Sequence, residues 1–220
     1  MSSKNVIVRR TAITAPALMF GYGVLRFIDG LDGDRGNGLA WDAGHVAFFV
    51  AMVLFGVLAV AMRPLTPTWA RRTGAVAVAA ALFGIGCFLW VIAGDLSDRF
   101  REAAPLPDVL ESGGSALFPL GMLVLLGLLV AARRLPVWSP LLFGAGIAAI
   151  TIDLDMLPFA SLIILAALAP LARPGDEDGR ANRGGHHRRE ATTADRGEVR
   201  IHEVNREAAR ARFKPQLSGH

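Results

Sequence analysis

Long runs without charge make up most of the sequence and limit what the chain can fold into. From Thr11 to Ala172 apolar stretches are separated by short polar turns, and after Ala172 charged residues become dense. A run of about 20 apolar residues is long enough to cross a hydrocarbon core of roughly 30 Å as a helix. In lipid, backbone polar groups must be bonded within the segment, and the runs lack the alternation of barrel strands, so we expect helices.

The sequence therefore predicts an all-α integral membrane protein with six transmembrane helices arranged as three hairpins. The predicted spans are 11–28, 43–62, 73–94, 113–132, 137–152 and 156–172. We interpret the first as a retained span, since no small-residue cleavage site of a signal peptide follows it. The last two are about 16 and 17 residues long, which is short for a bilayer, so one broken or re-entrant element over 137–172 is the alternative.

The charges of the turns predict the orientation. Turns on one side carry basic residues only: Lys4, Arg9, Arg10, Arg63, Arg71, Arg72, Arg133 and Arg134. Turns on the other side carry most of the acids: Asp29, Asp32, Asp34, Asp42, Asp95, Asp98, Glu102, Asp108, Glu111, Asp153 and Asp155. Cytoplasmic turns hold the excess of Lys and Arg. We expect both termini in the cytoplasm and the protein in the cell (plasma) membrane, of a bacterium to judge by its Arg, Ala and Gly usage.

A threefold pattern runs through the same region. Arginine pairs recur at equal intervals, and each opens an apolar run that contains Gly-x-Gly and ends at an acidic turn. The glycines are Gly21/Gly23, Gly84/Gly86 and Gly144/Gly146. The pattern predicts three equivalent hairpins related by an axis along the membrane normal. The alternative is that hairpins crossing one bilayer simply have similar lengths.

The acidic turns supply the candidate binding residues. Asp29, Asp95 and Asp153 each close an odd-numbered span on the same side, with Asp155 and Arg26 nearby. Brought together, such carboxylates would hold a hard cation of unknown identity. The alternative is that these residues are ordinary solvated turns. For Arg26 the alternatives are a side chain that snorkels to the outer headgroups or pairs with Asp29, and a buried ion pair with Asp153 that lines a polar cavity.

Asp42 and His45 stand three residues apart at the start of the second predicted span. Asp42 is placed to cap the first turn of that helix. His45 would then lie at the membrane interface and could sense pH, because histidine changes its charge near neutral pH. The two side chains could also contribute to a metal site, although no third ligand is identifiable.

Catalytic signatures are missing from the sequence. It contains no His-Glu-x-x-His, no Gly-x-Ser-x-Gly and no phosphate-binding loop, so we expect no catalytic residue and no cofactor. Cys87, the one cysteine, rules out an internal disulfide. A bundle over 1–172 and a basic, mostly disordered cytoplasmic tail over 173–220 are the two expected regions.

These features favour a non-enzymatic membrane protein with a structural or regulatory role through its tail. The tail would contact anionic lipid or a cytoplasmic protein. Acids interspersed among its bases argue against nucleic acid as a partner. The alternatives are a small cation-binding transporter or sensor that uses the acidic turns, and a membrane enzyme acting on lipid or a lipid-linked substrate. The sequence leaves the oligomeric state open.

Overall fold

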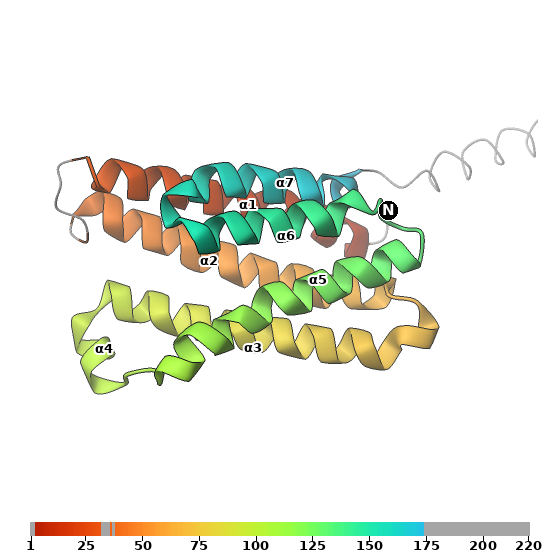
Figure 1. Cartoon of the computed structure of the whole chain (residues 1–220), viewed down its shortest axis with the longest axis horizontal. Helices are drawn as coiled ribbons and strands as arrows, with labels where there is room; N and C mark the ends of the chain where they lie inside the picture. The colour runs from red at the N-terminus through yellow and green to blue at the C-terminus, as the bar shows by residue number, and fades with distance from the viewer. Residues whose placement is uncertain (1–2, 32–35, 37, 174–220) are drawn as a thin grey trace, which may run out of the picture. The chain divides into compact units, whose positions relative to one another are not determined.

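The computed structural model describes residues 3–31, 36 and 38–173, and every regular element among them is helical (Figure 1). The long helices are α1 (Ser3–Asp29), α2 (Leu39–Met62), α3 (Arg71–Leu96), α5 (Ser115–Ala131), α6 (Trp138–Ile152) and α7 (Leu157–Ala172). Shorter ones are α4 (Asp98–Ala103), a π-helical turn (Val109–Gly114) and 3-10 turns at Arg63–Leu65, Thr68–Ala70 and Leu154–Met156. The predicted tail lies outside the described residues.

Five of these helical stretches are long and apolar enough to cross a membrane, and α6 is a shorter apolar helix. The membrane-helical class is therefore supported. Exposed apolar side chains, such as Val76, Leu141 and Phe159, lie along the outside of the helices. Water-soluble monomers rarely show apolar surface on this scale. The pattern fits a bundle whose solvent is lipid.

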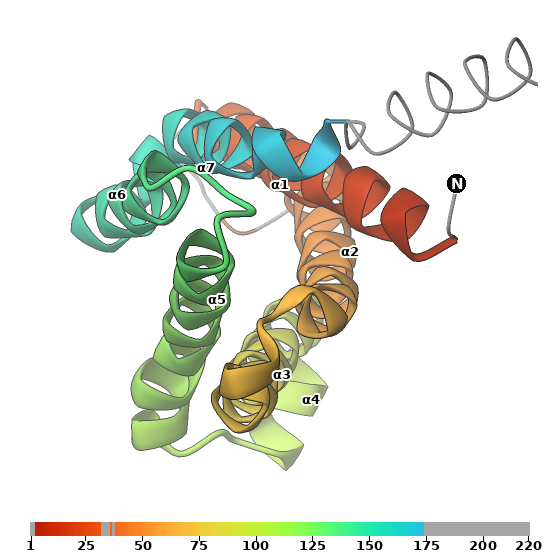
Figure 2. The same cartoon turned by 90° about the vertical axis from the view of Figure 1, so that its right-hand side faces the viewer.

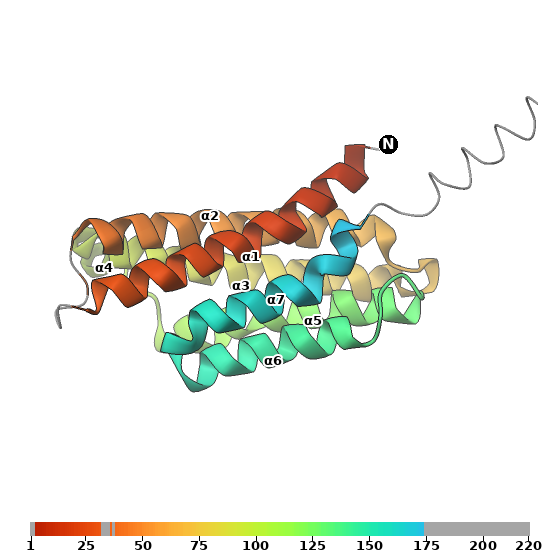
Figure 3. The ribbon, with the colours of Figure 1, turned by 90° about the horizontal axis from the view of Figure 1, so that it is seen from above.

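Consecutive long helices pack side by side. The pairs are α1 with α2, α3 with α5, and α6 with α7; α1 also packs on α7, and α2 on α3 (Figures 2 and 3). Over 137–172 the chain forms two helices that run back along each other around the turn at Leu154–Met156, not one continuous element. Phe55 of α2, Phe118 of α5 and Phe143 of α6 meet in the core, with ring centroids 5.4 and 6.5 Å apart.

Basic and acidic turns lie at opposite ends of the helices (Figure 1). One end, here called the arginine end, carries the α2–α3 and α5–α6 connections with Arg63, Arg71 and Arg134. The other, the aspartate end, carries the end of α1, the connection from α3 through α4, and the α6–α7 turn with Asp153. The charge separation read from the sequence is thus present in space.

The glycines of the threefold pattern do not make equivalent contacts. A Cβ on Gly23 would lie 2.8 Å from Pro158 of α7, which belongs to a different hairpin. At the corresponding second glycine of the other two motifs, a Cβ on Gly146 would meet Ile164 in the partner helix α7 of its own pair, and one on Gly86 would meet no atom within 4 Å. The first, third and fifth long helices therefore lack the common packing that true repetition would give.

One local expectation is wrong. Asp42 does not cap α2, because the helix begins three residues earlier at Leu39 and its N-cap is Gly38. Gly38 has a φ of 90°, a left-handed value that glycine adopts without a steric cost. Asp42 therefore sits, exposed, within the first turn of the helix.

Candidate functional site

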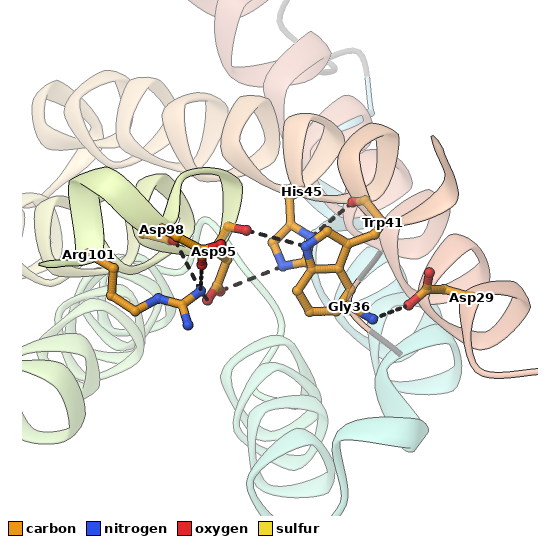
Figure 4. A network of polar contacts seen from close by, with 8 residues as sticks. Asp29, Gly36, Trp41, His45, Asp95, Asp98 and Arg101 are labelled. Atoms are coloured by element: carbon orange, nitrogen blue, oxygen red, sulfur yellow. Dashed lines mark hydrogen bonds and ion pairs between the residues drawn. The ribbon is translucent and has the colours of Figure 1, made fainter. Parts of the chain in front are cut away.

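His45 is the centre of a polar cluster at the aspartate end of the helices (Figure 4). Its side chain comes from the second turn of α2 and is almost fully buried, with 2% of the residue exposed. Trp41 lies one turn earlier on the same face, because residues four apart in a helix are neighbours. The two ring centroids are 4.1 Å apart, and the edge of the Tyr22 ring from α1 packs against His45 at 5.2 Å.

Both nitrogens of the His45 ring face acceptors. Nδ1 lies 2.9 Å from the Trp41 carbonyl oxygen, and Nε2 lies 3.6 Å from Oδ2 of Asp95 at the end of α3. A carbonyl oxygen only accepts, so Nδ1 carries the hydrogen of that bond. A neutral imidazole then has a lone pair on Nε2 and no hydrogen to offer Asp95. One extra proton, on the ring or on the carboxyl group, is needed to satisfy the pair.

Asp95 is held from several sides. The Trp41 indole N–H donates to its backbone oxygen at 3.3 Å, and an Arg101 Nη lies 3.4 Å from Oδ1. The same Arg101 nitrogen donates to the Gly94 carbonyl at 3.1 Å and lies 3.8 Å from Asp98. The carboxylate therefore links α2, α3 and α4.

The short helix α4 brings Arg101 into this position. The Ser97 hydroxyl caps α4 by accepting from the Phe100 amide at 3.3 Å. The Trp90 indole donates to the Ala104 carbonyl at 2.9 Å, which fastens the far end of α4 to α3. A cavity of about 100 Å³ lined in part by Asp95 and Arg101 remains beside the cluster.

Arg26 lies next to the cluster on α1. It hydrogen-bonds the Tyr22 side chain one turn earlier, and Tyr22 stacks on Phe48 of α2 at 4.6 Å. Its Nε is buried and finds no hydrogen-bond partner in the described part of the chain. Among those residues, neither Asp29 nor Asp153 forms an ion pair with it, so neither predicted pairing of Arg26 is present.

The predicted acidic residues have separate local roles. Asp29 is 6% exposed, and its Oδ2 accepts from the Gly36 amide at 3.0 Å. Asp153 is exposed, and its Oδ1 accepts from the Asp155 amide at 2.9 Å to cap the turn between α6 and α7. No group of three or more His, Cys, Asp or Glu side chains within the described ranges could hold a metal ion. The geometry thus gives the cation hypothesis no support.

The sequence identified His45 and Asp95 as candidate residues, but it did not predict that their side chains lie next to each other. They are 50 positions apart and become neighbours only through the packing of α2 on α3. Tyr22 and Arg101 gave no signal of their own, because an aromatic residue at a span end and an arginine in a turn are both common. Comparison with protein-family models, curated proteins and solved structures yields no match.

Proposed function

We propose that this chain is a non-enzymatic, six-span protein of the cell membrane that responds to protons at its outer face. Both termini lie in the cytoplasm, and the aspartate end faces outward. The charge separation supports this orientation, because Lys and Arg are retained on the cytoplasmic side. The proposal counts α6 as a span although it has 15 residues and is about 22 Å long at 1.5 Å per residue.

Reporter fusions test this topology. Fusions after residues 35 and 154 should report the outer compartment, and fusions after residues 68 and 135 the cytoplasm. If residues 135 and 154 report the same side while 35 and 68 differ, α6 and α7 form a re-entrant element and the protein has four spans. If 35 and 68 share a compartment, the orientation fails.

One observation carries the proton response: Nε2 of the buried His45 ring and a carboxylate oxygen of Asp95, whose side chain is 34% exposed, are two acceptors that face each other unless an extra proton is present. Buried ionisable groups in membrane helices are costly, and they commonly mark functional positions. The charged or titratable groups around the ring are Asp95 with Arg101 behind it on α3 and α4, and Tyr22 and Arg26 on α1.

Proton loss should loosen the contact between α2 and α3. In the protonated form the positive charge of His45, whose Nε2 lies 3.6 Å from Oδ2 of Asp95, attracts that carboxylate and so ties the second turn of α2 to the last turn of α3. Without the proton that attraction is lost, and the indole bond from Trp41 is the direct polar link between the two helices that remains among the described residues. The last turn of α3 would then be held to α2 by fewer contacts.

Fluorescence of the full chain in nanodiscs tests the response. Trp69 and Trp138 are changed to phenylalanine, so that the signal comes from Trp90 and from Trp41, whose ring centroid lies 4.1 Å from that of His45. We expect the emission to change in one step as the pair gains or loses its proton. His45→Gln should abolish that step. Asp95→Asn keeps the contact, because the asparagine amide can donate to Nε2, and should reduce the step, because the carboxylate that favours the extra proton is gone.

The tail offers a matched control. Four of the five histidines lie after residue 173, so replacing His186, His187, His202 and His220 with glutamine should leave the titration unchanged. An unchanged titration in His45→Gln would refute the proposal.

A structural or regulatory role for the tail is the second part of the proposal. The tail would carry the response to anionic lipid or to a cytoplasmic protein, and its basic residues beside an anionic leaflet support this. Residues 174–220 lie outside the described part of the chain, so the role stays a prediction. Deletion of 174–220 should have the same effect on cells as deletion of the whole chain, and it should leave the fluorescence titration of the purified protein intact.

A further inference from the structure

A groove runs between α2 and α3 on the outside of the helices at the arginine end. Its volume is about 950 Å³, at the upper end of the range of roughly 300–1,000 Å³ typical of small-molecule sites. It begins near the turns that join α2 to α3 and extends along both helices toward their middle. Figures 1 and 2 show α2 and α3 side by side over this length.

The walls of the groove are apolar, and one of its lining glycines leaves space open. Val53 and Val57 line it from α2, and Leu82 lines it from α3. Gly56 packs closely on Leu82, whereas Gly86 stands where a larger side chain would fill the space. A Cβ on Gly86 would meet no atom within 4 Å, so that position opens directly into the hollow.

The mouth of the groove is cationic. Arg63 at the end of α2 and Arg71 at the start of α3 line it together with Thr66. Both arginines are exposed, and no carboxylate of the described residues pairs with either. Trp69 stands in the same connection with 75% of its surface exposed, as is common at the level of lipid headgroups.

We propose that this groove binds an anionic phospholipid. One acyl chain lies along Val53, Val57 and Leu82, and the phosphate lies between Arg63 and Arg71. The apolar part of the groove lies along the helices and matches the acyl chain in the membrane core. The two arginines lie at the mouth and match the phosphate at the membrane surface. Basic pockets between helices on the cytoplasmic side bind anionic headgroups in this way. The site shares with the proposed function only the premise that the helices sit in lipid.

Other occupants match the groove less well. A free phosphate ion would use the arginines and leave the apolar length empty. A zwitterionic lipid places a cation beside its phosphate, so two unpaired arginines give it no advantage. A second copy of the chain presents arginines at this level, and like charges would repel.

Native mass spectrometry of the full chain from mixed micelles tests the site. Dioleoylphosphatidylglycerol and dioleoylphosphatidylcholine compete at equal concentration, and inorganic phosphate is titrated separately. We expect one retained phosphatidylglycerol. Arg63→Gln with Arg71→Gln should weaken it about 25-fold, or fivefold for each basic residue at about 1 kcal/mol. Arg72→Gln with Arg134→Gln, which removes two arginines of the same end that do not line the groove, should leave it unchanged.

A second pair of variants tests the apolar part without touching charge. Gly86→Leu should displace the lipid by filling the groove, and Gly127→Leu is the control, because its Cβ would also meet no atom within 4 Å but lies on α5. Equal retention of the two lipids, equal effects of the two arginine pairs, or unchanged binding in Gly86→Leu would each overturn the proposal. So would a lipid-free dimer that Gly86→Leu dissociates, or phosphate binding as tight as that of the lipid.

Discussion

Gly84 supports the sharpest test of how α3 and α5 pack. A Cβ at this position would collide with the backbone nitrogen of Phe118 and lie 2.9 Å from its Cα and Cβ. One and two turns earlier on α3, Ala81 and Ala77 face Gly121 of α5 in the same way. Small residues at such positions let membrane helices approach closely, and here the neighbours are backbone atoms that cannot rotate aside.

The expected cost of Gly84→Ala follows from two opposing terms. Overpacking a filled core costs about 1–3 kcal/mol, and a clash with backbone belongs at the upper end. Alanine in a helix is more stable than glycine by roughly 1 kcal/mol. The free energy of unfolding should therefore fall by about 2 kcal/mol. Two residues further on, Gly86→Ala meets open space and should gain up to about 1 kcal/mol.

Reversible unfolding in bicelles or detergent measures both variants against the parent chain. Each variant is the control for the other, because both replace glycine with alanine on α3 at nearly the same depth in the membrane. If Gly84→Ala is as stable as Gly86→Ala, then α3 and α5 do not approach as closely as the structure shows. A large loss in both variants would instead show that glycine is needed for backbone conformation and not for space.

Four further changes should shift the free energy of unfolding by amounts that depend on burial. Ser139→Ala removes a buried 2.7 Å hydrogen bond from α6 to a carbonyl of α7 and should cost about 1 kcal/mol in the same unfolding assay. Phe143→Ala, from a fully buried ring, should cost about 3–5 kcal/mol, whereas Phe159→Ala, from a ring 67% exposed, should cost far less. Arg101→Gln breaks an exposed ion pair and should cost at most about 1 kcal/mol, less still in high salt.

The helices were predictable because membrane solvation acts on each segment separately. Helices cover every predicted span, since a long apolar run must satisfy its own backbone whatever its neighbours are. What the sequence did not indicate lies between the runs. The π-helical turn at Val109–Gly114 and the helix α4 depend on local bonds, such as the Ser97 cap, that have no periodic apolar pattern behind them.

The candidate site was predicted only in part, for a related reason. The distribution of charged residues between the turns predicted which end of the helices carries Asp29, Asp95 and Asp153. It did not predict which side chains face one another across helices. The side of α3 that faces α2 is set by packing at Gly56 against Leu82 and Ile85, far from the polar residues. Burial of His45 follows from that packing, so the sequence could flag the residue without showing its partner.

The two proposed sites sit at opposite ends of the same pair of helices. His45 and Asp95 join α2 to α3 at the aspartate end, and the groove with Arg63 and Arg71 separates them at the arginine end. A change in helix spacing at one site would therefore act on the other. Thermodynamic linkage makes such an effect mutual: a factor by which proton loss changes lipid affinity is also the factor by which the lipid changes proton affinity. Rigid helices that pivot where Gly56 packs on Leu82 and Ile85 would give that factor its largest value, and independent flexing of each end would bring it to one.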